Sequence, residues 1–167
     1  MSDLRSRFPD VHFYNPFLTE VQDDVVIGPG TRVGSFTLIH RGARIGANVT
    51  IGSHCNICDC RIGDRVSIQT GCHVTRGVQI DDDAFLGPGV LTLNDILKGA
   101  ELLFPHIGTH AKIGGGCVIL PGVHIGEWAL IGAGSIITRN VPAGKTFFGN
   151  PARLRAVAPR GDQLSLI

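Results

Sequence analysis

Aliphatic residues recur every six positions along most of this chain. The count runs from Val21 to Leu86, with one residue lost after Ile57, and it runs again from Ile107 to Ile137. All eighteen positions hold Ile, Val or Leu: Val21, Ile27, Val33, Ile39, Ile45, Ile51, Ile57, Ile62, Ile68, Val74, Ile80, Leu86, Ile107, Ile113, Ile119, Ile125, Ile131 and Ile137. A period of six matches neither an amphipathic helix nor a long alternating strand.

Two further positions of the six-residue unit hold a restricted set of residue types. A small residue stands four positions after the aliphatic one, as at Thr37 and Cys72. In the shortened unit after Ile57, Cys60 takes this inward place and leaves Arg61 outside. One large and one small inward column fill a narrow tube without voids. The residue that follows the aliphatic is Gly in ten units, at positions 28, 34, 46, 52, 63, 87, 108, 114, 126 and 132.

This repeat predicts an all-β fold, a parallel β-helix whose short strands pair with the coils above and below. Three units make a triangular coil of 18 residues, which gives about six coils over residues 21–142. Residues 1–20 are expected to cap the first coil, and residues 143–167 to form a C-terminal cap and tail. Residues 92–106 (TLNDILKGAELLFPH) leave the repeat as a protruding loop. Such an excursion from a regular scaffold is usually functional.

Composition and charge narrow the possible functions. Aromatic residues make up only 6% of the chain, so small and β-branched aliphatics must fill the core. The net charge of +1 supplies no basic field for nucleic acid or an anionic membrane. The chain has no apolar run of 18 residues and no signal-peptide pattern at its start. We therefore expect a cytoplasmic protein with no nucleic-acid or membrane partner.

The five cysteines do not indicate a metal site or disulfides. Cys55, Cys58 and Cys60 lie close together, but structural zinc takes four ligands at paired spacings and no second cluster follows. Cys55, Cys72 and Cys117 occupy the small inward column, where Cys packs as a small hydrophobic residue.

The histidines raise one alternative. His73, His106 and His110 invite comparison with the γ-class carbonic anhydrases, which hold zinc at a trimer seam. The first histidine ligand of that family lies further past the glutamine of a similar Ile-Gln segment, where this chain has Thr75 and Arg76. No metal is expected, and a zinc protein stays open as an alternative.

A run near the C-terminus carries a specific resemblance. Residues 113–155 (IGGGCVILPGVHIGEWALIGAGSIITRNVPAGKTFFGNPARLR) resemble the C-terminal signature of the hexapeptide-repeat acyltransferases that use acetyl-CoA. The resemblance implies left-handed coiling, a homotrimer, and CoA lying along the prism between two subunits. Small residues let the pantetheine arm approach, and arginines can meet the CoA phosphates. The matching positions are Gly115, Ala133, Thr138, Arg139 and Arg153.

A second segment points to the acceptor. Residues 67–95 (SIQTGCHVTRGVQIDDDAFLGPGVLTLND) are similar to N-acetyltransferases that act on nucleotide-linked 3-amino sugars. Where sugar O-acetyltransferases have a catalytic His, this chain has Asn94, which cannot act as a general base. A neutral amine is already nucleophilic and needs less help than an alcohol. The resemblance implies an acetyl-CoA-dependent N-acetyltransferase whose acceptor is an amino sugar.

The catalytic candidates follow from this hypothesis. Asn94 would position the amine or the tetrahedral centre, while backbone N–H groups stabilise the oxyanion. Asp95 would orient the ammonium or take its proton. His73, one coil from Leu91 at the root of the loop, is a candidate proton acceptor. So is His124, which is expected in the same column one coil beyond Leu91.

One enzymatic alternative and one non-catalytic alternative stay open. The first is O-acetyl transfer to a sugar or small alcohol with His106 or His73 as base. The second is a non-catalytic or zinc-binding trimer.

Overall fold

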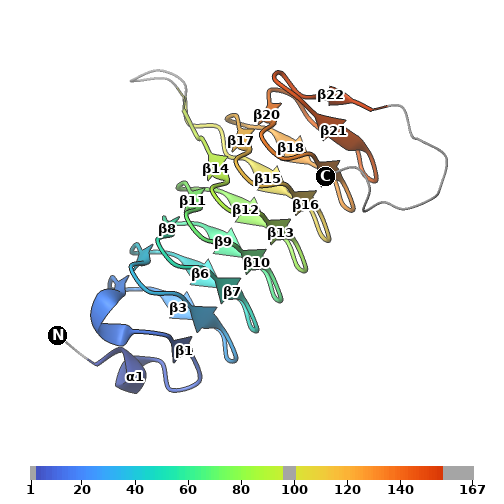
Figure 1. The fold of residues 1–167 in the computed structure, drawn as a ribbon. Coiled ribbons are helices and arrows are strands. Elements are labelled where there is room, and N and C mark those ends of the chain that lie inside the picture. The colour runs from blue at the N-terminus through green and yellow to red at the C-terminus, as the bar shows by residue number, and fades with distance from the viewer. Residues whose placement is uncertain (1–2, 96–100, 156–167) are drawn as a thin grey trace, which may run out of the picture.

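The computed structural model describes residues 3–95 and 101–155 and is a left-handed parallel β-helix of about seven turns (Figure 1). The predicted all-β, left-handed parallel β-helix is confirmed. Two short helical elements, α1 (Leu4–Arg7) and the 3-10 turn η1 (Pro16–Leu18), lie near the N-terminus. The chain then passes round a triangular prism, and each face of the prism is one sheet.

We call the three sheets face A, face B and face C. Face A contains β1 (His12–Phe13), β4 (Arg32–Val33), β7 (Thr50–Ile51), β10 (Ser67–Ile68), β13 (Phe85–Leu86), β16 (Lys112–Ile113), β19 (Leu130–Ile131), β21 (Thr146–Phe148) and β22 (Arg153–Leu154). Face B contains β2 (Glu20–Val21), β5 (Leu38–Ile39), β8 (Asn56–Ile57), β11 (His73–Val74), β14 (Leu91–Thr92), β17 (Val118–Ile119) and β20 (Ile136–Ile137). Face C contains β3 (Val26–Ile27), β6 (Arg44–Ile45), β9 (Arg61–Ile62), β12 (Gln79–Ile80), β15 (His106–Ile107) and β18 (His124–Ile125).

Three edges join the faces and carry the turns. Edge AB follows face A along the chain and includes residues 87–89; edge BC follows face B and includes residues 75–77; edge CA follows face C and includes residues 81–83. Neighbouring strands on a face are parallel, except that β22 runs antiparallel to β21. A residue on one coil therefore lies directly above its counterpart on the next.

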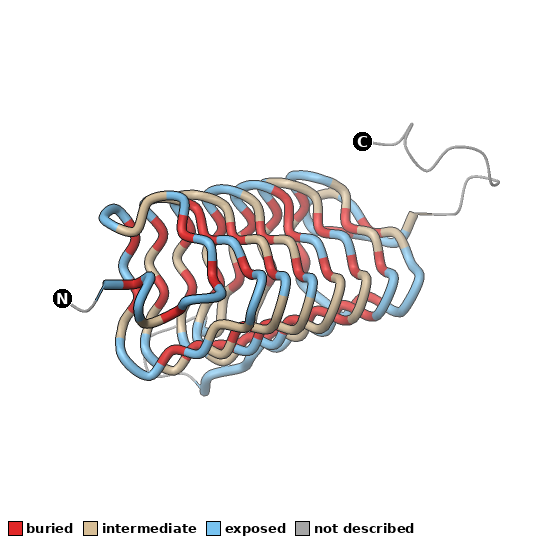
Figure 2. The backbone as a smooth tube through the Cα atoms, turned by 90° about the horizontal axis from the view of Figure 1, so that it is seen from below, coloured by how far each residue is buried: buried red, intermediate tan, exposed pale blue. Residues whose placement is uncertain are grey.

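The core is the two inward columns that the repeat predicts. Seventeen of the eighteen aliphatic positions are buried, and Ile27 is partly buried. Figure 2 shows the buried positions recurring at regular intervals along every coil. Cys60 is buried and Arg61 is exposed, which confirms the assignment made for the shortened unit. The buried Cys55, Cys72 and Cys117 direct their sulfur atoms at backbone carbonyls 3.2 Å away.

The parallel ladder is longer than the repeat predicts, with about seven turns rather than six. β1 pairs with β4 and β21 pairs with β19, so both end coils lie outside the range 21–142. Phe13 and Phe147 fill the inward positions of these coils and are buried. Both residues are aromatic, and both lie off the six-residue spacing, because Phe13 is eight residues before Val21 and Phe147 is ten after Ile137. The aliphatic count therefore missed these two coils.

The N-terminal segment closes one end of the tube. Leu4 and Phe8 are buried, and the Phe8 ring lies 6.1 Å from that of Phe13. The Arg7 guanidinium donates to the carbonyl oxygen of Val21 at 2.9 Å and to that of Gln22. In the part of the chain that the structure describes, no helix has the length and apolarity of a membrane span.

Candidate functional site

Asn94 lies at edge BC, two residues after the end of β14. Its side-chain amide donates to the carbonyl oxygen of Arg76 on the preceding coil at 3.0 Å. The backbone N–H of Leu103 donates to the Asn94 carbonyl at 2.9 Å, so the two arms of the loop meet at its base. Within residues 3–95 and 101–155, no donor reaches Asn94 Oδ1, which leaves this oxygen available to accept a hydrogen bond from an amine.

Asp95 follows Asn94 on the exposed side of the edge, and no ion pair joins it to another described residue. The remainder of the loop between Asp95 and Glu101 lies outside the described residues. Asn94 and Asp95 are therefore adjacent to one another at the root of the loop, as the sequence predicts.

His73 lies on face B rather than at edge BC. It pairs with Leu91, which confirms its expected place one coil from the loop root. Its Nε2 is 3.8 Å from Cys58 Sγ. Burial lowers the pKa of His73, and the nearby His40 lowers it further, so the ring stays neutral and able to accept a proton near neutral pH. No contact brings it to Asn94 or Asp95 within the described residues.

We expect His73→Gln to make the protein less sensitive to acid. The folded pKa of His73 is lowered, so the unfolded chain binds more protons below about pH 6.5 and folding stability is lost as the pH falls. Urea unfolding at neutral and mildly acidic pH measures the difference. The free energy of unfolding should fall less on acidification in His73→Gln than in the wild type. An unchanged dependence in His73→Gln would contradict this assignment.

The predicted CoA-binding positions fall into separate sets. Gly115 and Ala133 lie on successive coils at edge AB, where the Gly134 N–H donates to the Gly115 carbonyl at 2.8 Å. Thr138 and Arg139 follow β20 at edge BC and are exposed. Arg153 is exposed on β22 beyond the last coil of face A. Face B separates the first two sets, so a single copy does not bring them together.

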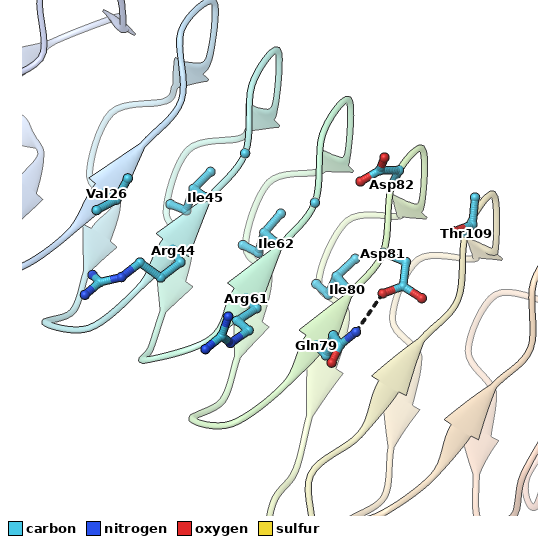
Figure 3. A pocket seen from close by; sticks show the side chains of 12 residues that line it. Val26, Arg44, Ile45, Arg61, Ile62, Gln79, Ile80, Asp81, Asp82 and Thr109 are labelled. Atoms are coloured by element: carbon cyan, nitrogen blue, oxygen red, sulfur yellow. Dashed lines mark hydrogen bonds between the residues drawn. The ribbon is translucent and has the colours of Figure 1, made fainter.

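Face C carries a polar column of which sequence reasoning identified only single members. Arg44, Arg61, Gln79, His106 and His124 occupy the outward positions of successive strands. A groove of about 750 Å³ runs over the first three of them (Figure 3). In each case the residue stands immediately before a buried aliphatic, and this position is the only sequence signal that could have identified the column.

An Asp–His pair lies at one end of this groove. His106 Nε2 is 2.7 Å from Asp81 Oδ2, and Gln79 Nε2 donates to Asp81 Oδ1 at 2.9 Å. Both carboxylate oxygens are therefore engaged, and the second ring nitrogen of His106 can serve as a base. The His124 ring meets the His106 ring edge-on, with centroids 4.7 Å apart. Of these groups, His106 and His124 were candidates from the sequence, and Asp81 and Gln79 were not.

The expected position of His124 is wrong. It lies on face C in register with His106, whereas Val118 is the residue paired with Leu91 on face B. Thr92 explains the error because it is a buried polar residue in the inward aliphatic column of face B. The repeat therefore resumes on face C after the loop, one face later than the hydrophobic count implies.

The three histidines compared with zinc ligands lie apart in one copy. His73 is on face B, His106 is on face C, and His110 is at edge CA, where its ring stacks on Trp128 with centroids 4.0 Å apart. The described residues contain no group of three or more His, Cys, Asp and Glu side chains arranged to hold one metal ion.

Comparisons with known families agree with this geometry. A model described as "Bacterial transferase hexapeptide (six repeats)" matches residues 24–58 and 104–139, and one described as "Hexapeptide repeat of succinyl-transferase" matches residues 42–91. The coils are thus hexapeptide repeats wound into a left-handed parallel β-helix. The chain belongs to the bacterial hexapeptide-repeat transferases.

Two curated proteins are similar to this chain over about two thirds of its length. Nodulation protein L of Rhizobium leguminosarum bv. viciae is 44% identical over 124 residues, which cover 67% of this chain and 65% of that protein. Nodulation protein L of Rhizobium meliloti (strain 1021) is 44% identical over 118 residues, which cover 66% of this chain and 60% of that protein. The chain therefore spans less than two thirds of the length of these two relatives.

Solved structures share the fold at low sequence identity. The acetyltransferase domain of PglB from Neisseria gonorrhoeae FA1090, in complex with acetyl coenzyme A, has a TM-score of 0.58 at 20% identity, covering 87% of this chain and 58% of that one. AntD, an N-acyltransferase from Bacillus cereus in complex with dTDP and coenzyme A, has a TM-score of 0.63 at 18% identity, covering 96% and 90%.

Proposed function

We propose that the protein is an acetyl-CoA-dependent N-acetyltransferase that acts on the amino group of a nucleotide-linked amino sugar. The observation that carries the proposal is the order of residues along edge BC. Asn94 stands at the loop root, and Thr138 and Arg139 lie two coils further along the same edge. A CoA molecule laid along this edge with its phosphates at Arg139 has its thioester toward Asn94.

Two copies of the chain complete the CoA site. Gly115 and Ala133 lie at the opposite edge of face B from Thr138 and Arg139, so one pantetheine arm touches both sets only where edge AB of one copy meets edge BC of another. The outward residues of face B near these coils, Leu91, Val118 and Ile136, are apolar and half-buried. Burying them in a closed ring favours a homotrimer.

The relatives support the choice of substrates. The PglB domain holds acetyl coenzyme A on this fold, and AntD is an N-acyltransferase that holds dTDP and coenzyme A. Acetyl coenzyme A matches the proposed acetyl donor, and dTDP matches the nucleotide part of the proposed acceptor.

The reaction needs little from the protein beyond positioning. The neutral amine attacks the thioester carbonyl, the C–N bond forms, the tetrahedral centre collapses and CoA leaves as the thiol. Asn94 Oδ1 accepts a hydrogen bond from the amine and directs its lone pair at the carbonyl. Backbone N–H groups of the coil stabilise the oxyanion. Asp95 attracts the incoming ammonium. His73 or Asp95 receives the proton that the attacking nitrogen loses and passes it to the departing CoA sulfur.

A thiol-release assay tests the proposal. Purified protein and acetyl-CoA are offered free amino sugars, nucleotide-linked amino sugars and simple alcohols, and mass spectrometry locates the acetyl group. We expect release with amines and an amide in the product. Release with alcohols alone, or no release with any acceptor, would refute N-acetyl transfer.

One observation favours a second candidate function. The 2.7 Å contact of His106 with Asp81 polarises an imidazole, as a base for a hydroxyl acceptor requires. O-acetyl transfer would make His106→Ala inactive toward an alcohol. Under N-acetyl transfer we expect His106→Ala to acetylate amines at a rate close to that of the wild type.

A further inference from the structure

Two adjoining depressions on face C form one continuous groove, here called the arginine groove. The first, about 750 Å³, and the second, about 580 Å³, share Arg44, Arg61 and Gln79 in their walls. Figure 3 shows Arg44 and Arg61 on successive coils with their side chains on the same side of the sheet. The size of the groove suits a small organic ligand.

The arginine groove reaches the proposed reaction centre. Arg76, Gly77 and Phe104 line the second depression, and the Arg76 carbonyl is the group that holds the Asn94 amide. The Phe104 ring covers Gly77, where an added Cβ would lie 2.1 Å from the ring. The groove therefore starts beside Asn94 and extends toward the N-terminal coils, away from Thr138 and Arg139.

Both charge signs line the arginine groove: three arginines (Arg44, Arg61 and Arg76) and four aspartates (Asp24, Asp59, Asp81 and Asp82). The Arg44 guanidinium lies 3.0 Å from Asp24, and that of Arg76 lies 3.9 Å from Asp59. Arg61 stands between them in register with Arg44, and among the described residues no carboxylate lies within ion-pair distance of it. Like charges on adjacent strands, about 4.8 Å apart, repel one another. A bound anion would relieve this repulsion and satisfy Arg61.

We propose that the arginine groove binds the acceptor and that Arg61 binds a phosphate group of it. This inference rests on the proposed function and assigns the place of its acceptor: the amine lies at Asn94, and the phosphate or diphosphate that the sugar carries lies over β9. The guanidinium presents a planar set of donors that fits phosphate oxygens in pairs. CoA and acceptor then occupy opposite directions along the prism from Asn94.

Binding of phosphate-bearing probes tests the inference. Calorimetry without acetyl-CoA would measure uridine diphosphate, thymidine diphosphate and inorganic pyrophosphate against the wild type, Arg61→Gln and Arg32→Gln. Arg32 is a matched control because it is an exposed outward arginine at the equivalent position of face A. We expect Arg61→Gln to weaken binding by about tenfold or more, from the loss of charge-assisted hydrogen bonds, and Arg32→Gln to leave it unchanged. Because Arg61 is exposed, its replacement leaves the core intact.

The outcomes separate the two proposals. Equal affinity in Arg61→Gln, or no binding of any probe to the wild type, would refute the groove as a phosphate site even if thiol release with an amine occurs. Specific binding at Arg61 with no thiol release from any acceptor would refute acetyl transfer and leave the anion site. An unphosphorylated amino sugar acetylated with the same kcat/KM as its nucleotide-linked counterpart would overturn the proposed substrate class.

Discussion

Replacing Gly87 by Ala should destabilise the protein by about 3 kcal/mol, the upper range for forcing an extra carbon into a packed site. Gly87 lies at edge AB, and a Cβ added there would sit 2.5 Å from the Gly115 nitrogen of the next coil. That atom is backbone in a rigid ladder, so it cannot move aside as a flexible side chain would. Urea unfolding at a fixed protein concentration measures the loss, since stability of an oligomer varies with concentration.

Gly89 supplies the matched control in the same turn. Its φ is +68°, and no atom lies within 4 Å of an added Cβ. Gly89→Ala therefore bears only the cost of a left-handed backbone, about 1 kcal/mol. If Gly87→Ala were no more destabilising than Gly89→Ala, close approach of the coils would not explain the glycine column.

The contrast shows why the sequence predicts this fold so well. Each coil repeats the same geometry, so the inward positions meet the same steric limit once per six residues. The glycine positions meet theirs at edges AB and CA, where the coils approach one another closely. The aliphatic column is interrupted where another residue type fills the inward position. Phe13 and Phe147 close the two ends, and Thr92 is a buried hydroxyl whose Oγ1 is 2.9 Å from that of Thr75.

The outward residues could be predicted only in part. Asn94 and the edge positions were identified from motifs, and the structure places Asn94 at the loop root as expected. Asp81 and His106 meet although they are 25 residues apart, because the loop inserts extra residues between two adjacent coils. No 18-residue spacing relates them, and outward side chains are under no packing constraint that would mark them in the sequence. The contact between Asp81 and His106 can be recognised only once the strand register is known.

The same register brings Asn94 against Arg76, and this contact shapes the functional prediction. Asn94→Ala should lower kcat/KM for the amine acceptor by about 100-fold, the lower range for removing one preorganised polar group from a reaction centre. The side chain uses its amide nitrogen to hold the Arg76 carbonyl and leaves Oδ1 for the substrate. Alanine removes both, so the amine loses its orienting acceptor.

Steady-state thiol release measures the activity loss, and two further measurements separate chemistry from structure. The lost hydrogen bond to Arg76 should cost about 1 kcal/mol in urea unfolding, and acetyl-CoA affinity should stay near that of the wild type. Asn48→Gly is the control, because Asn48 lies at edge CA with φ +56°, a conformation that glycine adopts without strain. It should retain full activity. If Asn94→Ala kept the wild-type kcat/KM, Asn94 would have no part in the reaction; if its activity fell only with a loss of folded protein, its role would be to anchor the loop.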